Sequence, residues 1–123
     1  MNTTPPRAVI LFAHGSRDPL WHKPMEAVAA QVAKDEPGVT VRCAYLELSK
    51  PDLETVCQQL VAVGTLQIAV VPMFLGVGRH AREDLPLLVE QLRARHPKVV
   101  FALKPAVGED ARLIALLAQI AVE

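Results

Sequence analysis

The sequence predicts an α/β fold: a doubly wound sheet of four parallel strands with helices on both faces. Short apolar runs alternate with longer segments in which apolar residues recur every three or four positions, and this rhythm repeats four times along the 123 residues. Such alternation is typical of parallel strands joined by crossover helices. The length corresponds to a single domain over residues 1–123, of which residues 1–6 are expected to form a flexible tail.

The first two strands are predicted from runs at residues 8–13 and 39–46. Residues 8–13 are apolar throughout, which in a parallel sheet indicates a strand covered on both faces and therefore a central position. Residues 39–46 alternate polar and apolar side chains in their first half, as an edge strand permits. Between them, apolar residues spaced three or four apart predict a helix over about residues 19–34.

The second crossover and the third strand follow the same rhythm. Ser49, which precedes Lys50 and Pro51, resembles a helix start, and Gly64 is a candidate C-cap for that helix. Residues 68–75 are almost wholly apolar, so the third strand is also expected at the centre of the sheet.

The last third of the chain completes the pattern. Asp84, two residues before Pro86, is a second capping signal and predicts a helix that opens there and runs to about Arg95. The fourth strand is expected over residues 99–103. A final helix follows Gly108 and carries an apolar stripe formed by Leu113, Ile114, Leu117 and Ile120.

Two central and two edge strands joined by right-handed crossovers predict the spatial order 2-1-3-4. In that order the connections that leave the first and third strands go to opposite faces, which opens a crevice beyond the carboxyl ends of these strands. Ligands of doubly wound sheets bind in such a crevice. The functional residues are therefore expected in the segments that follow the strands.

Composition and charge exclude several classes of protein. The 13 Lys and Arg balance the 13 Asp and Glu and are scattered, so no basic footprint for nucleic acid appears. No apolar run approaches the ~18 residues of a membrane span, and the first residues do not resemble a signal peptide, so a cytoplasmic protein without a membrane partner is expected. Cys43 and Cys57 have no metal or redox spacing and are interpreted as buried thiols.

Three potential metal ligands follow three different strands. His14 comes directly after the first strand, Glu47 after the second, and His80 after the third. Because the carboxyl ends of parallel strands meet at one edge of the sheet, these side chains are expected on the same side. Two imidazoles and a carboxylate suit a divalent transition metal such as Co²⁺, Ni²⁺, Fe²⁺ or Zn²⁺. His14 and His80 are expected in two loops, where either histidine alone is better explained by an ordinary loop role, and Glu47 is explained equally well by one; the shared placement favours a metal site.

Further candidates surround this constellation. Arg17, Arg79 and Arg82 have the ordinary role of solvated charges as their alternative, but their proximity to the crevice would serve an anionic substrate; Ser16 and Gly78 lie in the same two segments. Ser16 has an alternative role as a helix cap. Gly78, like its neighbour Gly76, permits a positive φ and a close approach of the backbone, although both also suit an ordinary turn. His22 and His96 lie in or beside helices and are assigned structural roles.

Several familiar catalytic motifs are absent from the sequence. There is no G-x-x-x-x-G-K-[ST] loop, so ATP is not expected to drive the reaction, and there is no G-x-S-x-G nucleophile elbow. Histidine phosphatases also place His-Gly after a first strand, but that family has Arg immediately before the histidine, where this chain has Ala13.

At these residues the chain resembles the class II, ATP-independent tetrapyrrole chelatases, especially the small sirohydrochlorin cobaltochelatases of the CbiX type. Four segments, in order and at matching spacing, carry the resemblance: HGSRD from His14, YLELSKPDL from Tyr45, VVPMFLGVGRHAREDLP from Val70, and the weaker KPAVGEDARLIALL from Lys104. The resemblance extends over nearly the whole chain, and the third segment is the most specific.

The resemblance implies insertion of a divalent metal, most typically Co²⁺, into sirohydrochlorin on the cobalamin route. The two metal-binding histidines of the family correspond to His14 and His80, and its acidic residue to Glu47, which acts as either a metal ligand or a general base. The carboxylates of the macrocycle are expected to be bound by five cationic residues: Arg17, Arg79, Arg82, Lys50 and Lys104. Longer members carry two such units, so a homodimer that encloses the substrate is implied.

Two alternatives remain open from the sequence. A ferrochelatase of siroheme synthesis or a nickel chelatase would use similar histidines, because imidazole accepts all three ions and selectivity depends on geometry and supply. The second alternative is a non-catalytic module that binds metal in the same crevice without turnover.

Overall fold

A computed structural model describes residues 6–123, and residues 1–5 of the predicted tail lie outside the described part. Pro6, the last residue of that tail, is held by the main chain: its carbonyl accepts hydrogen bonds from the amides of Leu66 (2.9 Å) and Gln67 (3.2 Å). The centre of the molecule is a four-stranded sheet in which all neighbours are parallel. Its strands are β1 (Arg7–Ala13), β2 (Val39–Tyr45), β3 (Gln67–Pro72) and β4 (Val100–Leu103).

The strand order β2-β1-β3-β4 confirms the predicted topology, with β1 and β3 central and β2 and β4 at the edges. The register aligns the carboxyl ends: Ala13 of β1 lies opposite Tyr45 of β2, and Phe12 lies opposite Pro72 of β3. Residues that follow these three strands therefore emerge at one edge of the sheet, as the sequence predicts.

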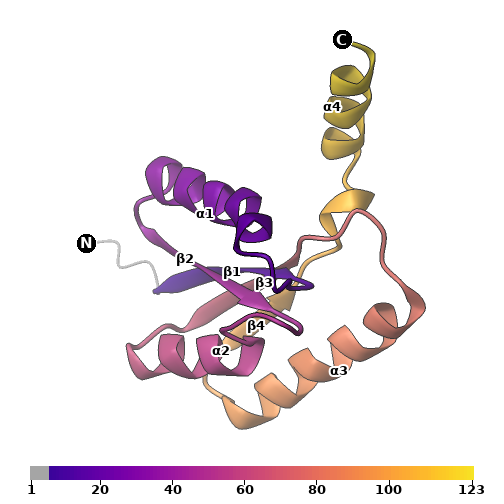
Figure 1. The fold of residues 1–123 in the computed structure, drawn as a ribbon. Helices are drawn as coiled ribbons and strands as arrows, with labels where there is room; N and C mark the ends of the chain where they lie inside the picture. Colours follow the sequence, from indigo (N-terminus) through magenta and orange to yellow (C-terminus); the bar gives the residue numbers. More distant parts are fainter. Residues whose placement is uncertain (1–5) are drawn as a thin grey trace.

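Helices cover both faces, but unequally (Figure 1). A short 3-10 helix, η1 (Pro19–His22), leads into α1 (Lys23–Asp35), which packs over β2 and β1 on one face. The opposite face carries α2 (Leu53–Ala62) and α3 (Arg79–Arg95). The larger of two hydrophobic clusters lies under α2 and α3, and includes Ile10, Phe12, Val56, Val70 and Val89.

The C-terminal helix does not join either layer. After the 3-10 helix η2 (Val107–Glu109), α4 (Ala111–Val122) projects away from the body of the molecule (Figure 1). None of its residues is buried. The predicted apolar stripe is present on this helix, but no layer formed by residues 6–123 buries it.

Two predicted helix starts are wrong. The second crossover helix begins at Leu53 rather than near Ser49, because the carboxylate of Asp52 caps it through the Thr55 amide (2.8 Å). The third begins at Arg79, with Gly78 as its N-cap, and not at Asp84. Pro86 lies inside this helix, where a proline removes one main-chain hydrogen bond and its ring crowds the carbonyl group four residues earlier.

Other local predictions have mixed outcomes. Gly64 does close the second crossover helix, with φ of 91° just beyond the cap residue Val63. The third strand ends at Pro72, three residues earlier than predicted. Cys57 is buried as expected, and burial raises the pKa of its thiol to about 12, whereas Cys43 is only half-buried. Within residues 6–123, no helix has both the length and the hydropathy that a membrane crossing requires.

Candidate functional site

His14 leaves the central strand β1 directly at the carboxyl edge of the sheet. Its imidazole lies over the ring of Phe74, with centroids 4.4 Å apart and planes inclined by 36°. Phe74 is itself part of the core, with 3% of its surface exposed, and contacts Phe12 edge to face. The exposed imidazole therefore rests on a fixed apolar support, which limits its orientations while it stays accessible to solvent.

The segment that carries Glu47 is joined to the His14 segment through the main chain. The Glu47 amide donates to the His14 carbonyl (2.9 Å), and the Leu46 amide donates to the Ala13 carbonyl (2.9 Å). These bonds continue the pairing of β1 with β2 beyond the ends of the strands. Glu47 thus lies two residues beyond the end of β2, with its amide bonded to His14 and its side chain exposed.

Gly15 permits this close approach of the two segments. Its φ is 101°, and a Cβ atom at this position would lie 1.7 Å from the Glu47 carbonyl oxygen. Both observations exclude a side chain here. Leu48, the residue directly after Glu47, adopts φ of 63° without being glycine, a conformation that costs of order 1–3 kcal/mol when a surrounding structure imposes it.

Ser49 links the two segments to η1, and sequence reasoning missed this role. The Ser49 hydroxyl donates to the Ser16 carbonyl (2.7 Å) and accepts from the Ser16 amide (2.9 Å), and His22 Nε2 lies 2.8 Å from it. A serine hydroxyl has only one hydrogen to donate, so His22 must donate from Nε2. Ser49 is 33 positions from Ser16 and 27 positions from His22 along the chain, so no local pattern in the sequence indicates these contacts.

His80 lies in the first turn of α3, so the prediction that it occupies a loop is wrong. The side chain of His80 is exposed, as are those of Arg79 and Arg82. Arg79 pairs with Glu83 (3.1 Å), one turn further along the helix. Gly76 and Gly78 do not use the freedom predicted for them, because neither has a positive φ and an added Cβ atom would meet nothing within 4 Å.

The structure does not assemble a closed metal site. Among residues 6–123, no three His, Cys, Asp or Glu side chains lie close enough together to hold an ion, and this includes His14, Glu47 and His80. The fold brings the segment of His14 together with that of Glu47. His80 lies at the start of α3, the helix that follows the central strand β3. That His14 and His80 bind one ion stays a prediction.

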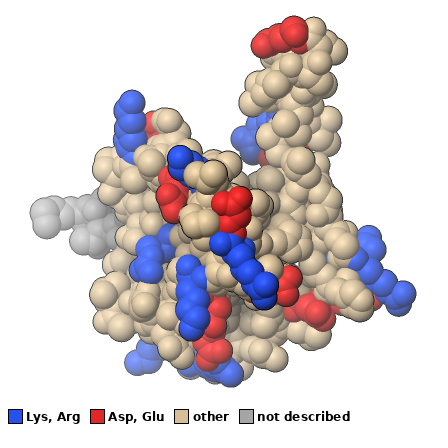
Figure 2. All heavy atoms as spheres, viewed as in Figure 1, with Lys and Arg blue, Asp and Glu red and all other residues tan. Residues whose placement is uncertain are grey.

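Two of the five predicted cations line one hollow. Arg82 and Lys104 both border a hollow of about 400 Å³ between the first turns of α3 and the segment after β4, with Val77 and Pro105 as apolar neighbours. Lys104 is placed there because its amide continues the β3–β4 pairing to the Val70 carbonyl (2.9 Å). Arg17, Lys50 and Arg79 are exposed elsewhere. Basic and acidic side chains are interspersed over the viewed face of the molecule (Figure 2).

Ser16 and Asp18 act locally as well. The Ser16 hydroxyl accepts from the Asp18 amide (3.1 Å), and the Asp18 carboxylate accepts from the Leu20 amide (2.9 Å) to cap η1. The capping alternative for this segment is therefore realised, chiefly by Asp18. His96 ends α3, as its structural assignment predicts.

The chain was compared with known proteins. The CbiX family model matches residues 8–123. The sirohydrochlorin cobaltochelatase of Methanopyrus kandleri is 33% identical over 82 residues, which is 67% of this chain and 57% of that protein. The sirohydrochlorin ferrochelatase of Bacillus subtilis is 29% identical over 111 residues, 88% of this chain and 41% of that protein.

A solved structure extends the likeness to three dimensions. The crystal structure of a Marinobacter aquaeolei CbiX protein, provisionally assigned to cobalamin (vitamin B12) biosynthesis, has a TM-score of 0.82 at 34% identity and covers 94% of both chains. By contrast, the chain spans little more than half of the archaeal cobaltochelatase and less than half of the bacterial ferrochelatase. The match of the family over 8–123 nevertheless includes every strand residue from Ala8 onward and all the candidate site residues, and the chain belongs to the CbiX family.

Proposed function

We propose that this protein is an ATP-independent chelatase that inserts a divalent metal ion into sirohydrochlorin, with Co²⁺ as the favoured metal. The observation that carries the proposal is the placement of His14: an exposed imidazole, seated on the buried ring of Phe74, at the carboxyl end of a central strand. The names of the relatives support the substrate, and they include both a cobaltochelatase and a ferrochelatase. Fe²⁺ and Ni²⁺ are therefore the alternative metals.

In the proposed reaction, neutral His14 and His80 bind the ion and leave its other positions to water. The two pyrrole N–H groups of the macrocycle each lose a proton as the nitrogens take the metal, so one M²⁺ enters and two protons leave. Glu47 serves as acceptor for these protons or as an additional ligand. Its carboxylate suits either role because it is exposed beside the His14 segment.

The carboxylates of the macrocycle require cations at the same edge. Arg82 and Lys104, which border one hollow, are proposed to bind them, with Arg17, Lys50 and Arg79 as further contacts. Ser16 and Gly78 lie in the same segments and complete the proposed substrate-binding set. A homodimer that encloses the macrocycle would supply a second copy of these groups.

The proposal is tested by mixing the purified full-length protein with sirohydrochlorin and either Co²⁺, Fe²⁺ or Ni²⁺, and following the absorption bands of the macrocycle. Insertion of at least one metal well above the protein-free rate is expected, and the fastest ion identifies the preferred metal. Metal binding without any change in insertion rate would instead support the non-catalytic module and overturn the chelatase proposal.

His14→Ala and His80→Ala are each expected to lower the insertion rate by at least tenfold, because each removes one of two metal ligands. Both side chains are exposed, so the midpoint of urea unfolding should be almost unchanged. His96→Asn, at the far end of α3, is the matched control and should retain normal insertion. Normal turnover of either the His14 or the His80 variant would contradict the assignment of the two ligands.

A further inference from the structure

Glu47 begins a turn whose conformation is unfavourable by itself. The Ser49 amide donates to the Glu47 carbonyl (2.7 Å) and closes a three-residue turn around Leu48, whose φ is 63°. Turns of this kind with a positive φ at the central residue are rare and strained. The Leu48 side chain is 57% exposed, so burial of this side chain does not offset the strain. Contacts outside the turn must therefore hold it in place.

The Ser49 hydroxyl is the contact that holds the far end of this turn. Its two hydrogen bonds with the main chain of Ser16 attach it to the segment that follows His14. A third bond comes from Nε2 of His22 (2.8 Å). The Ser16 amide and His22 together occupy both lone pairs of the hydroxyl, so its one hydrogen is left to the Ser16 carbonyl. The bond from His22 thus fixes the orientation of the hydroxyl.

Two aromatic rings hold the half-buried imidazole of His22 in place. Its centroid lies 4.9 Å from that of Tyr45 and 5.7 Å from that of Trp21. Tyr45 is the last residue of β2 and is only 4% exposed. His22 is the N-cap residue of α1, but its side chain makes no capping hydrogen bond to that helix. The imidazole therefore links η1 and α1 to Ser49.

We propose that His22 is a positioning residue for the chelatase reaction: through Ser49, it holds the strained turn that fixes where the Glu47 carboxylate leaves the main chain. This inference rests on the proposed role of Glu47 as proton acceptor or metal ligand. The main chain of Glu47 is attached on both sides, because its amide donates to the His14 carbonyl (2.9 Å) and its carbonyl accepts from Ser49. Loss of the bond from His22 loosens the second attachment, and the carboxylate then samples positions farther from His14.

The attachment is tested first in the full-length protein without metal or macrocycle, by hydrogen exchange of single amides followed by NMR. His22→Phe keeps an aromatic ring against Tyr45 and Trp21 but has no donor, whereas His22→Gln keeps a donor. The Glu47 amide is the reporter, because neither substitution removes its acceptor. It should exchange about tenfold faster or more in His22→Phe, and within about threefold of the wild-type rate in His22→Gln.

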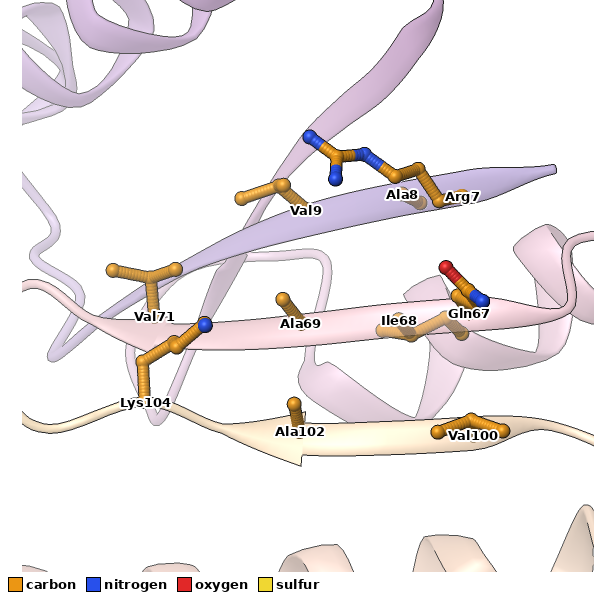
Figure 3. Close-up of a pocket in the computed structure, with 10 residues that line it drawn as sticks. All are labelled: Arg7, Ala8, Val9, Gln67, Ile68, Ala69, Val71, Val100, Ala102 and Lys104. Atoms are coloured by element: carbon orange, nitrogen blue, oxygen red, sulfur yellow. The ribbon is translucent and has the colours of Figure 1, made fainter. Parts of the chain in front are cut away.

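Two controls separate local loosening from a general loss of stability. The amides of Val9 and Ala69, which are paired in register in the central strands β1 and β3 (Figure 3), should exchange at unchanged rates. His96→Phe is the matched variant. Within residues 6–123 the buried Nε2 atom of His96 has no hydrogen-bond partner, so the same change of ring removes no bond there. Equal exchange of the Glu47 amide in His22→Phe and in the wild-type protein would overturn the proposal.

The consequence for the reaction is measured in the metal-insertion assay. His22→Phe should lower kcat about tenfold and change the KM for sirohydrochlorin less than about twofold, because the cations proposed to bind the macrocycle are untouched. His22→Gln should restore kcat to within about threefold of the wild-type value, and His96→Phe should have a normal kcat. A normal kcat in His22→Phe would also overturn the proposal. If the wild-type protein inserts no metal, the chelatase proposal fails and the role in the reaction fails with it, whereas the exchange rates decide separately whether His22 holds the turn.

Discussion

At the scale of single residues, Gly15 and Ser49 determine how the candidate site is held. Gly15 lets the His14 segment pass against the Glu47 carbonyl, and the Ser49 hydroxyl uses all of its hydrogen-bonding capacity to join Ser16 and His22. Neither residue is a proposed metal or substrate contact. They act by positioning the segments that carry His14 and Glu47.

Gly15→Ala is expected to destabilise the protein and to lower the metal-insertion rate. A non-glycine residue at φ of 101° costs of order 1–3 kcal/mol, and the added Cβ atom must also displace Glu47. Urea unfolding and the insertion assay measure the two effects. Gly76→Ala is the matched control, because its φ is not positive and its Cβ atom would meet nothing within 4 Å. Equal behaviour of the two variants would show that the contact with Glu47 has no role.

Residue chemistry also shows where prediction from sequence succeeds. His14 and Glu47 were placed together because parallel register alone aligns the ends of β1 and β2. The contact of Ser49 with His22 was missed because hydrogen bonds between distant positions leave no periodic signal. The seat of His14 on Phe74 was likewise unpredicted, since the third strand was expected to continue to residue 75 and to include that phenylalanine.

At the scale of elements, helix caps were the least predictable feature. Ser49 and Asp84 each precede a proline by two residues, as helix starts often do, yet the caps used are Asp52 and Gly78. Local signals of this kind are shared by turns and by helix interiors, and packing against the sheet decides between them. The wrong start for α3 matters for the site, because His80 was expected in a loop and instead lies in the first turn of this helix.

Asp52→Ala should shorten or fray α2 and lower the free energy of unfolding at neutral pH by about 1 kcal/mol, the usual cost of losing an N-cap. Hydrogen bonds from the Thr55 side chain and amide hold the pKa of Asp52 below its ordinary value. Its contribution is therefore complete above the unfolded pKa and is lost as the pH falls through the lower folded value. Asp52→Asn, which still caps, should lose this acid dependence in urea titrations at pH 2–6. An unaltered pH profile in that variant would contradict the assignment.

At the scale of the whole molecule, the two faces of the sheet differ in how fully they are covered. The central positions of β1 and β3 followed from apolar runs, because burial on both faces requires such runs, and right-handed crossovers then predicted the order of strands. The position of α4 could not be predicted in this way. Its stripe indicates that the helix packs against something, and a sequence pattern does not specify whether the partner belongs to the same chain.

The unequal faces predict different responses to the same substitution. Val70→Ala, at a site with no exposed surface, should cost about 2 kcal/mol or more. Val100, which borders an open groove over β3 and β4 (Figure 3), is 64% exposed. Val100→Ala should therefore change the free energy of unfolding by less than about 0.5 kcal/mol. Calorimetry of the two variants measures this difference.

The hydrogen bond from His22 to Ser49 has a consequence for behaviour in acid. The hydrogen on Nε2 is present both in the neutral tautomer that the contact requires and in the doubly protonated imidazolium ring. Uptake of a second proton occurs at Nδ1 and leaves the donor in place. The donor that joins η1 to the two segments is thus the same atom in either form of the ring.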